Sequence, residues 1–518
     1  MTRDDGLHAS VWAACEAFRG DMSWTECRDH ALALIFVKYM SDVWHKMYAQ
    51  SISVFGNVDG QTDDLIRRAM IRFRFYLPNI EVHDFKSARL SDKFLADIYS
   101  INQRREKPDI GFMIDRTLAL LEETNAPKLN NLFQHLRFNG EVVLGYGTRA
   151  IMRLRTLLLF LAELDMRAQM WAYPALFLFL IERFALENDS TPETPREIAR
   201  LLFHLTKPSP REHVADPVCA SASLLLAASH YGVPLVLAGQ EAAGNLWAIA
   251  RMNLLVHEKD DSIIQWGDGL CEPKLLDGHQ LHQFDVVLAN PPQDNAAWLA
   301  AWLSGQAAHD AWARFERGLP PKTRVDYAWI SHCLAMTRPG SGRLAMILPQ
   351  RILYGAGVEG RIRRRLLEEN LLDTVILLPA DVLPAAPVPM LVCLFDRARE
   401  AGGARAHVRD VLLMDASGAI GPNKQLRLLP AGQIDEIVVY VAFRQTWEPH
   451  CYLASIEEIA ANDYDLSLPR YLRAHEPHPA RDLPKVAQEI TTLAQTLQGL
   501  QNQMAQQLAS LIDAANGR

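Results

Sequence analysis

Residues 284–293 have the sequence FDVVLANPPQ, in which an apolar run ends at Asn290 and two prolines follow. A short apolar run bounded by turn residues predicts a buried β-strand. Comparable runs occur on both sides of it, separated by segments of helical periodicity: HVADPV, PLVLAGQE, GRLAMILP, LDTVILLP and VPMLVCLF. Strands that alternate with helices predict a doubly wound, mostly parallel sheet that is covered on both faces. We therefore predict an α/β fold for this part of the chain.

The regions on either side of these runs predict helices. Before them, apolar residues recur at helical spacing, as in CRDHALALIFVKYMSDVW at residues 27–44. After them, apolar residues between Val486 and Leu511 recur at steps of three and four, which is typical of a coiled-coil-like helix. We predict an N-terminal helical domain over residues 1–168, an α/β domain over 169–470 and a C-terminal helix over 471–518.

The composition is that of a globular protein in a reducing compartment. Of the 518 residues, 49% are hydrophobic and 22% are charged, which predicts a well-packed core. The N-terminus lacks the pattern of a signal peptide, and the longest apolar stretch, Met170 to Ile181, is about twelve residues, short of the roughly twenty that span a bilayer. Seven cysteines without a CxxC pair favour neither a zinc site nor a disulfide framework. We expect a cytoplasmic protein without a membrane segment.

Asn290, Pro291 and Pro292 directly follow the predicted strand, at the carboxyl edge of the sheet, where ligands bind in such folds. Two prolines fix the backbone there and hold the Asn290 amide outward. An amide together with a neighbouring carbonyl can hold an amine in a reactive orientation. Taken alone, the tetrapeptide is more often an ordinary turn.

Three earlier strand-like runs also end in polar residues. The segment DPVCASAS, residues 216–223, follows the first run and opens a helix, where a cofactor-binding turn is expected. The next run ends at Glu241, whose carboxylate could accept both hydroxyls of a ribose, and the third ends before Asp268, which could reach the ring of the same nucleoside. Each carboxylate could instead cap a helix or face solvent.

In this order, the cofactor turn, the GQE segment, a strand and NPP resemble the amino-group DNA methyltransferases, and in particular the modification subunits of Type I restriction-modification systems. Further segments extend the resemblance over nearly the whole chain: VWAACEAFRGDMSWTECRDHALALIFVKYMSDVW, TPREIARLL, GQEAAGNLWAIARMNLLVH, LPPKTRVDYAWISH, GRLAMILPQRILYGAGVEGRIRRRLLEENLLDTVILLP and NDYDLSLPRYL. It implies that residues 169–470 form a class I methyltransferase domain that transfers a methyl group from S-adenosylmethionine to adenine N6 in DNA.

The resemblance also implies roles for individual residues. Asn290, Pro291, Pro292 and Gln293 correspond to the catalytic motif that holds the amine of a flipped adenine, since N6 cannot be reached in the stacked duplex. The residues implied in cofactor binding are Thr194, Pro195 and Arg196, which close over the cofactor, Asp216, Cys219, Ala220 and Ser221 on its methionine side, and Glu241 on its ribose, with Asp268 expected nearby.

Several partners are implied as well. They are double-stranded DNA and a specificity subunit, and the family also allows a second methyltransferase subunit and a restriction subunit. The formal net charge of −8 is unusual for a protein that grips DNA alone. Either the basic residues gather on one face, or a partner supplies much of the contact with DNA.

Three departures from the family pattern fall on one pocket. The family has Phe or Tyr where this chain has Gln293; a base-aromatic stack contributes about 1–3 kcal/mol, and Trp298 or Tyr327 could replace it. Ala220 and Ser223 replace glycines of the cofactor turn, whereas related sequences accept Ala at Ala222. Pro192 and Glu193 replace an aromatic pair before Thr194. These departures predict weakened or lost cofactor binding.

An alternative hypothesis follows: a catalytically impaired pseudo-methyltransferase that serves as a DNA-binding or assembly subunit of a defence or methylation complex. Protein-glutamine or RNA methylation shares the logic of the NPP motif, but those enzymes do not share the helical N-terminal region or the LPPK and LPQRILYG segments.

Overall fold

A computed structural model gives the structure of the chain. It describes residues 3–20, 22–55, 74–77, 110–139, 148–187, 193–229, 233, 235–292, 302, 310–322, 324–380, 382–383, 389–418, 431–472 and 504. The chain divides into two compact units, Met1–Tyr471 and Leu472–Arg518, and the described elements all lie in the first. Gln293 lies outside the described residues, as does the predicted C-terminal helix apart from Tyr471, Leu472 and Met504.

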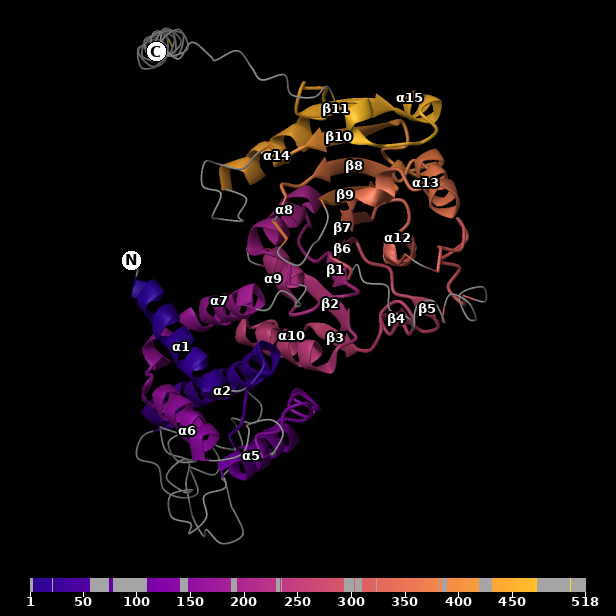
Figure 1. The fold of residues 1–518 in the computed structure, drawn as a ribbon. Coiled ribbons are helices and arrows are strands. Elements are labelled where there is room, and N and C mark those ends of the chain that lie inside the picture. The colour runs from indigo at the N-terminus through magenta and orange to yellow at the C-terminus, as the bar shows by residue number, and fades with distance from the viewer. Residues whose placement is uncertain are drawn as a thin grey trace, which may run out of the picture. The chain divides into compact units, whose positions relative to one another are not determined.

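The helices fall into two groups along the chain (Figure 1). The first group precedes the sheet: α1 (Arg3–Arg19), α2 (Trp24–Phe55), α5 (Ile110–Thr124), α6 (Thr148–Glu163) and α7 (Ala172–Glu187). The second group alternates with strands: α8 (Arg196–Thr206), α9 (Ser223–Ser229), α10 (Gly244–Val256), α12 (Asp326–Met336), α13 (Val358–Glu368), α14 (Ala431–Phe443) and α15 (Ile456–Ala461). The predicted helical N-terminal region is confirmed.

Over the described residues, the strands form a nine-stranded sheet in the order β11-β10-β8-β9-β7-β6-β1-β2-β3. Its members are β1 (His213–Asp216), β2 (Val236–Glu241), β3 (Ile263–Trp266), β6 (Val286–Ala289), β7 (Arg343–Pro349), β8 (Leu372–Leu377), β9 (Met390–Asp396), β10 (Asp410–Asp415) and β11 (Cys451–Ser455). A separate hairpin pairs β4 (Leu276–Asp277) with β5 (Gln280–Leu281). The pairs β7-β6, β6-β1, β1-β2, β2-β3 and β10-β8 are parallel, as predicted for an α/β fold.

Two strands run against the rest. β9 lies between β7 and β8 and is antiparallel to both, and β11 is antiparallel to β10. The apolar sequence of β9 predicts a strand but not its direction, because a strand buried on both faces has the same apolar pattern either way. β9 directly follows its neighbour β8 in the strand sequence, and such a connection allows antiparallel pairing without a crossover helix.

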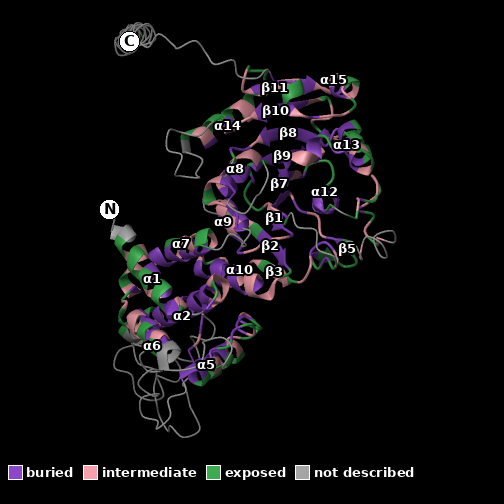
Figure 2. Cartoon of the chain, viewed as in Figure 1, coloured by how far each residue is buried: buried purple, intermediate pink, exposed green. Residues whose placement is uncertain are grey.

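Helices cover both faces of the sheet. In Figure 1, α8, α9 and α14 lie against one face, and α12 and α13 lie against the other. The central strands are buried along their length (Figure 2). Side chains on β6 alternate between the layers: Val286 and Leu288 belong to the core shared with α8 and α9, and Val287 faces the other way. The doubly wound arrangement is thus the one that the sequence predicts.

The N-terminal helices have their own core, and α10 is shared with it. Apolar residues of α1, α2, α5, α6 and α7 pack together, and Trp247, Met252 and Leu255 of α10 pack into the same cluster. The Tyr39 hydroxyl of α2 donates to the Leu255 carbonyl at 3.4 Å. α10 therefore joins the helical region to the edge of the sheet that holds β2 and β3. The proposed domain boundary near residue 168 stays a prediction.

In the described parts of the chain, no helix combines the length and apolar character needed to cross a membrane. All seven cysteines are free thiols.

A buried polar cluster joins α2 to α7. The Asp42 carboxylate accepts from the Lys38 ammonium at 2.5 Å and from the Tyr173 hydroxyl at 2.6 Å. All three side chains are buried. The Lys38 ammonium and the Asp42 carboxylate are therefore shielded from water, and each is stabilised mainly by the opposite charge of the other. Removing one partner of a buried ion pair leaves the second charge without compensation, which costs about 3–5 kcal/mol.

We therefore expect Asp42→Asn to lower the free energy of unfolding by about 3 kcal/mol, measured by urea denaturation. Asp165→Asn is the matched control, since Asp165 pairs with Arg167 on the surface and its side chain is 63% exposed. The control change is expected to cost less than about 1 kcal/mol. Equal losses in the two variants would contradict the role of the buried cluster.

Candidate active site

The candidate site lies where the order of the strands reverses. β1 is followed in sequence by β2 and β3 on one side, whereas β6 and β7 lie on its other side. In open α/β sheets, the crevice outside the carboxyl ends of the strands at such a reversal is where ligands bind. Asp216 and Glu241 are the last residues of β1 and β2, and Asn290 directly follows β6. The parallel register of these strands therefore brings the three predicted residues to one edge.

Asn290 is held by the segment before α8. Its Nδ2 donates to the Thr194 Oγ1 at 3.0 Å, although the two residues are 96 positions apart in the sequence. Because the amide nitrogen is engaged by Thr194, the amide oxygen is the atom left to accept a hydrogen bond from a ligand. Pro291 is buried and Pro292 is exposed, so the chain leaves the sheet at this point.

Thr194, Pro195 and Arg196 form the start of α8, with Pro195 as its N-terminal flanking residue. Thr194 is buried against Asn290, whereas the Arg196 guanidinium pairs with Glu182 of α7 at 3.1 Å. A cavity of about 220 Å³ adjoins this segment and is lined by Leu178, Glu182, Thr194, Arg196, Ala199, Arg200, Ser223, Leu226 and Ala227. The structure thus places Thr194 in the crevice and Arg196 at its border with α7.

The turn after β1 is fixed to the end of β2 by backbone hydrogen bonds. The Cys219 N–H donates to the Gln240 carbonyl at 3.0 Å, and the Ala220 N–H donates to the Glu241 carboxylate at 2.8 Å. The other Glu241 oxygen accepts from the Ala243 N–H at 2.8 Å. A Cβ on Gly239 would lie 2.8 Å from the Ile264 Cδ1 and 3.0 Å from the Cys219 sulfur, so a larger residue there would require these side chains to shift. Burial raises the pKa of the Cys219 thiol, which therefore stays protonated and unreactive.

Two alanines of this turn have the backbone conformation that glycine prefers. The φ angles of Ala220 and Ala222 are +44° and +67°. The left-handed conformation costs a residue with a Cβ roughly 1–2 kcal/mol. The sequence comparison singled out Ala220 and Ser223, but the second left-handed residue is Ala222, while Ser223 begins α9. The turn thus has left-handed residues at two positions without glycine, the residue that adopts this conformation without steric strain.

Glu193 is a site residue that the sequence analysis did not assign. Its carboxylate accepts from the Ser221 hydroxyl at 2.6 Å and also from the Ser223 hydroxyl. Glu193 and Ser223 both stand at positions where this chain departs from the family pattern, and in the structure they are partners. The sequence did contain a signal for this contact. Glu193 and Ser223 each add a polar group, and they lie on two segments that are both expected to contact the cofactor.

The crevice is acidic and buried. Burial, together with the charges of Glu241 and Glu193, raises the pKa of Asp216 to about 8 against the opposing hydrogen bond from the Val218 N–H. Burial likewise raises the pKa of Glu193 to about 7, despite hydrogen bonds from Ser221 and Ser223. The pKa of Glu241 is raised by burial too. Three carboxyl groups that repel one another would be stabilised by a bound cation.

Asp268 has a structural contact in addition to its predicted role. One of its oxygens accepts from the backbone N–H groups of Leu270 and Cys271, at 2.9 and 2.8 Å, as a capping residue does. Of the two rings considered as substitutes for a base stack, Tyr327 is buried and its hydroxyl donates to the Ile352 carbonyl at 2.7 Å. Tyr327 is therefore a core residue, and Trp298 lies outside the described residues.

Family models match two regions of the chain. Residues 175–479 match the model described as N-6 DNA Methylase, and residues 7–146 match the model of the HsdM N-terminal domain. The first region contains the sheet and the crevice, and the second corresponds to the N-terminal helices.

Individual relatives agree with these models. The Type I restriction enzyme MjaVIII methylase subunit of Methanocaldococcus jannaschii is 26% identical over 58% of this chain, and the match spans 52% of that relative, about half its length. The MpnII methylase subunit of Mycoplasma pneumoniae is 22% identical, over 91% of this chain and 90% of the relative. A solved type I restriction-modification methyltransferase subunit from Streptococcus thermophilus has the same fold, with a TM-score of 0.75, 23% identity, and coverage of 90% of this chain and 99% of that one.

The left-handed alanines generate the first prediction for this site. Ala220→Gly and Ala222→Gly each remove steric strain and add flexibility to the unfolded chain, so we expect a net gain of about 0.5–1 kcal/mol per site. Ala227→Gly, inside α9, serves as the control and should lose about 1 kcal/mol. Chemical denaturation of the three variants measures these differences, and a loss at all three positions would show that the turn is unstrained.

The raised pKa of Glu193 generates a second prediction. The folded protein holds this proton more tightly than the unfolded chain, so the group's contribution to stability is complete below about pH 4.5 and is lost as the pH rises through about 7. Between pH 5 and pH 8 the free energy of unfolding should fall by roughly 1–3 kcal/mol more in the native sequence than in Glu193→Gln. Parallel denaturation curves at both pH values test this, and identical pH dependence would contradict it.

Proposed function

This chain belongs to the N-6 DNA methylase family, and we propose that it is the modification subunit of a type I restriction-modification system. Its reaction would be the transfer of a methyl group from S-adenosylmethionine to N6 of adenine in DNA. The relatives that support this assignment are named as methylase subunits of type I restriction enzymes. The observation that supports it most directly is the Asn290–Thr194 hydrogen bond at the reversal of the strand order.

The charges of the crevice suit this cofactor. S-adenosylmethionine carries a sulfonium and an ammonium group, and it supplies the methyl group of the reaction. Asp216 and Glu193 lie in a buried acidic environment in which a cation would lower their pKa values. Glu241 still has lone pairs for a ribose beyond the two backbone bonds that it accepts. The left-handed alanines and the Glu193–Ser223 contact would weaken binding relative to a glycine-rich turn.

Asn290 would position the base. Its amide oxygen and the neighbouring carbonyl would accept the two N–H groups of the N6 amine, which aims the nitrogen lone pair at the methyl group. The target adenine must leave the duplex for this, because N6 is unreachable in the stack. Thr194 would act as a positioning residue, because its hydroxyl fixes the rotation of the amide. Pro291 and Pro292 stiffen the backbone on which Asn290 is mounted.

The partners of this proposal are double-stranded DNA and a specificity subunit, with a second methyltransferase subunit and a restriction subunit as further members of the complex. The relatives are named as subunits of larger enzymes, which supports an assembly. A formal net charge of −8 also favours a partner that supplies basic contacts to the DNA backbone.

The proposal predicts that Asn290→Ala lowers methyl transfer by at least about a hundredfold, since catalysis here is mainly positioning. The assay uses the assembled complex with its specificity subunit, DNA that contains the recognition sequence, and S-adenosylmethionine labelled in the methyl group. Asn139→Ala removes an exposed amide of the N-terminal region and is the matched control, with activity expected to stay within about twofold.

Cofactor binding is measured on the same preparations by calorimetry. Asn290→Ala is expected to bind S-adenosylmethionine as the native chain does, because Asp216 and Glu241 at the ends of β1 and β2 keep their contacts in this variant. If the native complex incorporates no label into any DNA, the proposed activity is wrong. If Asn290→Ala retains full activity, the assignment of the catalytic residue is wrong.

A further inference from the structure

A second cavity lies at the opposite edge of the sheet from the candidate active site. Its walls include Lys207 at the end of α8, Arg343 at the start of β7 and Asp373 near the start of β8. Asp396 ends the antiparallel strand β9 and so lies at the same edge. Val438 and Val441 of α14 and Arg444, which directly follows α14, close the side. The cavity has a volume of about 270 Å³.

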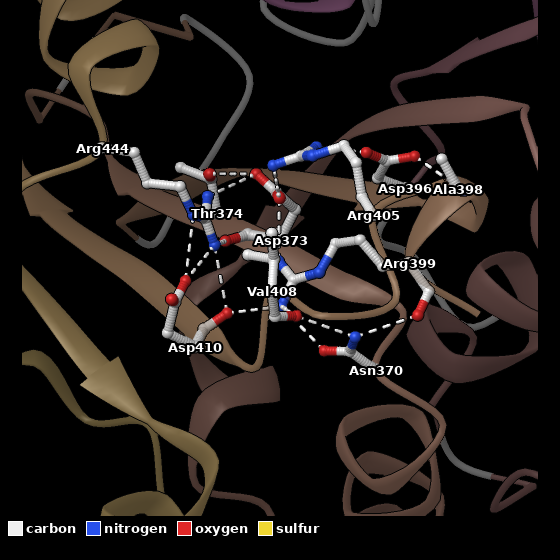
Figure 3. A network of polar contacts seen from close by, with 10 residues as sticks. All are labelled: Asn370, Asp373, Thr374, Asp396, Ala398, Arg399, Arg405, Val408, Asp410 and Arg444. Atoms are coloured by element: carbon white, nitrogen blue, oxygen red, sulfur yellow. Dashed lines mark hydrogen bonds and ion pairs between the residues drawn. The ribbon is translucent and has the colours of Figure 1, made fainter. Parts of the chain in front are cut away.

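Asp373 is the centre of a buried network beside this cavity (Figure 3). One of its oxygens accepts from Arg399 at 2.8 Å and from Arg405 at 3.2 Å, and the other accepts from Arg444 at 3.0 Å. Burial opposes ionisation, but the charges of Arg444, Arg399 and Arg405 hold the pKa of Asp373 below its ordinary value. One carboxylate is thus shared among three guanidinium groups.

This sharing leaves hydrogen-bond donors unused at the cavity wall. Each terminal nitrogen of Arg405 donates one bond, to Asp396 or Asp373, and has a second N–H. The terminal nitrogens of Arg343 donate to the Lys207 carbonyl and to Glu212, and each has a second N–H. The lining carries four cations, Lys207, Arg343, Arg405 and Arg444, and two carboxylates, Asp373 and Asp396. Two further carboxylates pair with these arginines, Glu212 with Arg343 and Asp410 with Arg444. With Arg399 included, five cations stand against four carboxylates, so one positive charge and several N–H donors remain in a chain of net charge −8.

The rest of the cavity wall is apolar and partly open. Leu205 of α8 and Val438 and Val441 of α14 line it, and each is only half-buried. A ligand that satisfied both walls would place an anionic group on the arginines and a ring or other apolar part between α8 and α14. Arginine forks match the geometry of phosphate oxygens, and a single phosphate can accept from several N–H groups at once.

We propose that this cavity, formed by the ends of α8, β7, β8 and β9 together with α14, is a binding site for a small phosphate monoester that carries a ring, with a mononucleotide as the simplest example. The phosphate would accept from Arg343 and Arg405, and the ring would lie against Leu205 and Val441. The site is separate from the methyl-transfer crevice and does not depend on the proposed function.

The test is isothermal titration calorimetry of the full chain with adenosine monophosphate, and with inorganic phosphate and a short DNA duplex as separate arms. We expect saturable binding of the mononucleotide with a stoichiometry of one, weaker binding of phosphate, and weakening as the salt concentration rises. Arg343→Gln and Arg405→Gln should each weaken binding at least about tenfold, which is the loss of one charge-assisted contact. Val441→Trp should block the cavity while keeping its charges.

Arg338→Gln is the matched control. Arg338 pairs with Asp285 at the same edge of the sheet but does not line the cavity, so the variant should bind the mononucleotide within about twofold of the native chain. Circular dichroism and thermal melting establish that each variant is folded, and Val441→Trp keeps the test decisive if an arginine variant is not. The proposal is overturned if the mononucleotide produces no saturable heat, if Arg338→Gln weakens binding as much as Arg343→Gln does, or if only the duplex binds.

Discussion

The parallel hydrogen bonding of β6, β1, β2 and β3 is the constraint on which the candidate site depends. Because these strands run in one direction, with β1 between β6 and β2, their carboxyl ends lie at one edge. β1 and β2 end in a polar residue, and β6 is followed by one. Asp216, Glu241 and Asn290 come from positions up to 74 residues apart, and the register brings them together. The apolar strand interiors provide the core energy that holds the polar ends in place.

The cofactor turn shows how one departure from a family pattern can accompany another. With a glycine in place of Ser223, Glu193 would lose one of the two hydroxyls that it accepts from, and a buried carboxyl group without partners is costly. With an aromatic residue in place of Glu193, the two serines would lose their acceptor. The substitutions at Glu193 and Ser223 therefore support each other, because each side chain supplies the hydrogen-bond partner of the other. They make this side of the crevice more polar than an aromatic residue and a glycine would. As a consequence, the crevice contains a carboxyl group whose pKa is about 7.

The sequence predicted the strands, the α/β class and the helical N-terminal region, because periodicity and turn residues are local signals. It also placed Asp216, Glu241 and Asn290 at strand ends. It could not predict the antiparallel direction of β9, the left-handed angle of Ala222 or the contact of Glu193 with Ser221 and Ser223, since these depend on segments that meet only in the folded chain. For the same reason the sequence left open whether Tyr327 could replace the missing ring, because its burial and its hydrogen bond to the Ile352 carbonyl are tertiary properties.

Net charge describes this chain poorly because its charges are separated between the two edges of the sheet. At the carboxyl edge, buried carboxyl groups dominate, and burial raises the pKa values of Asp216 and Glu193. At the amino edge, three arginines share Asp373, two of them pair with Asp396 or Asp410 as well, and N–H donors remain. α8 connects the two, since Thr194 lies just before its first residue, and Thr206 at its end lines the second cavity.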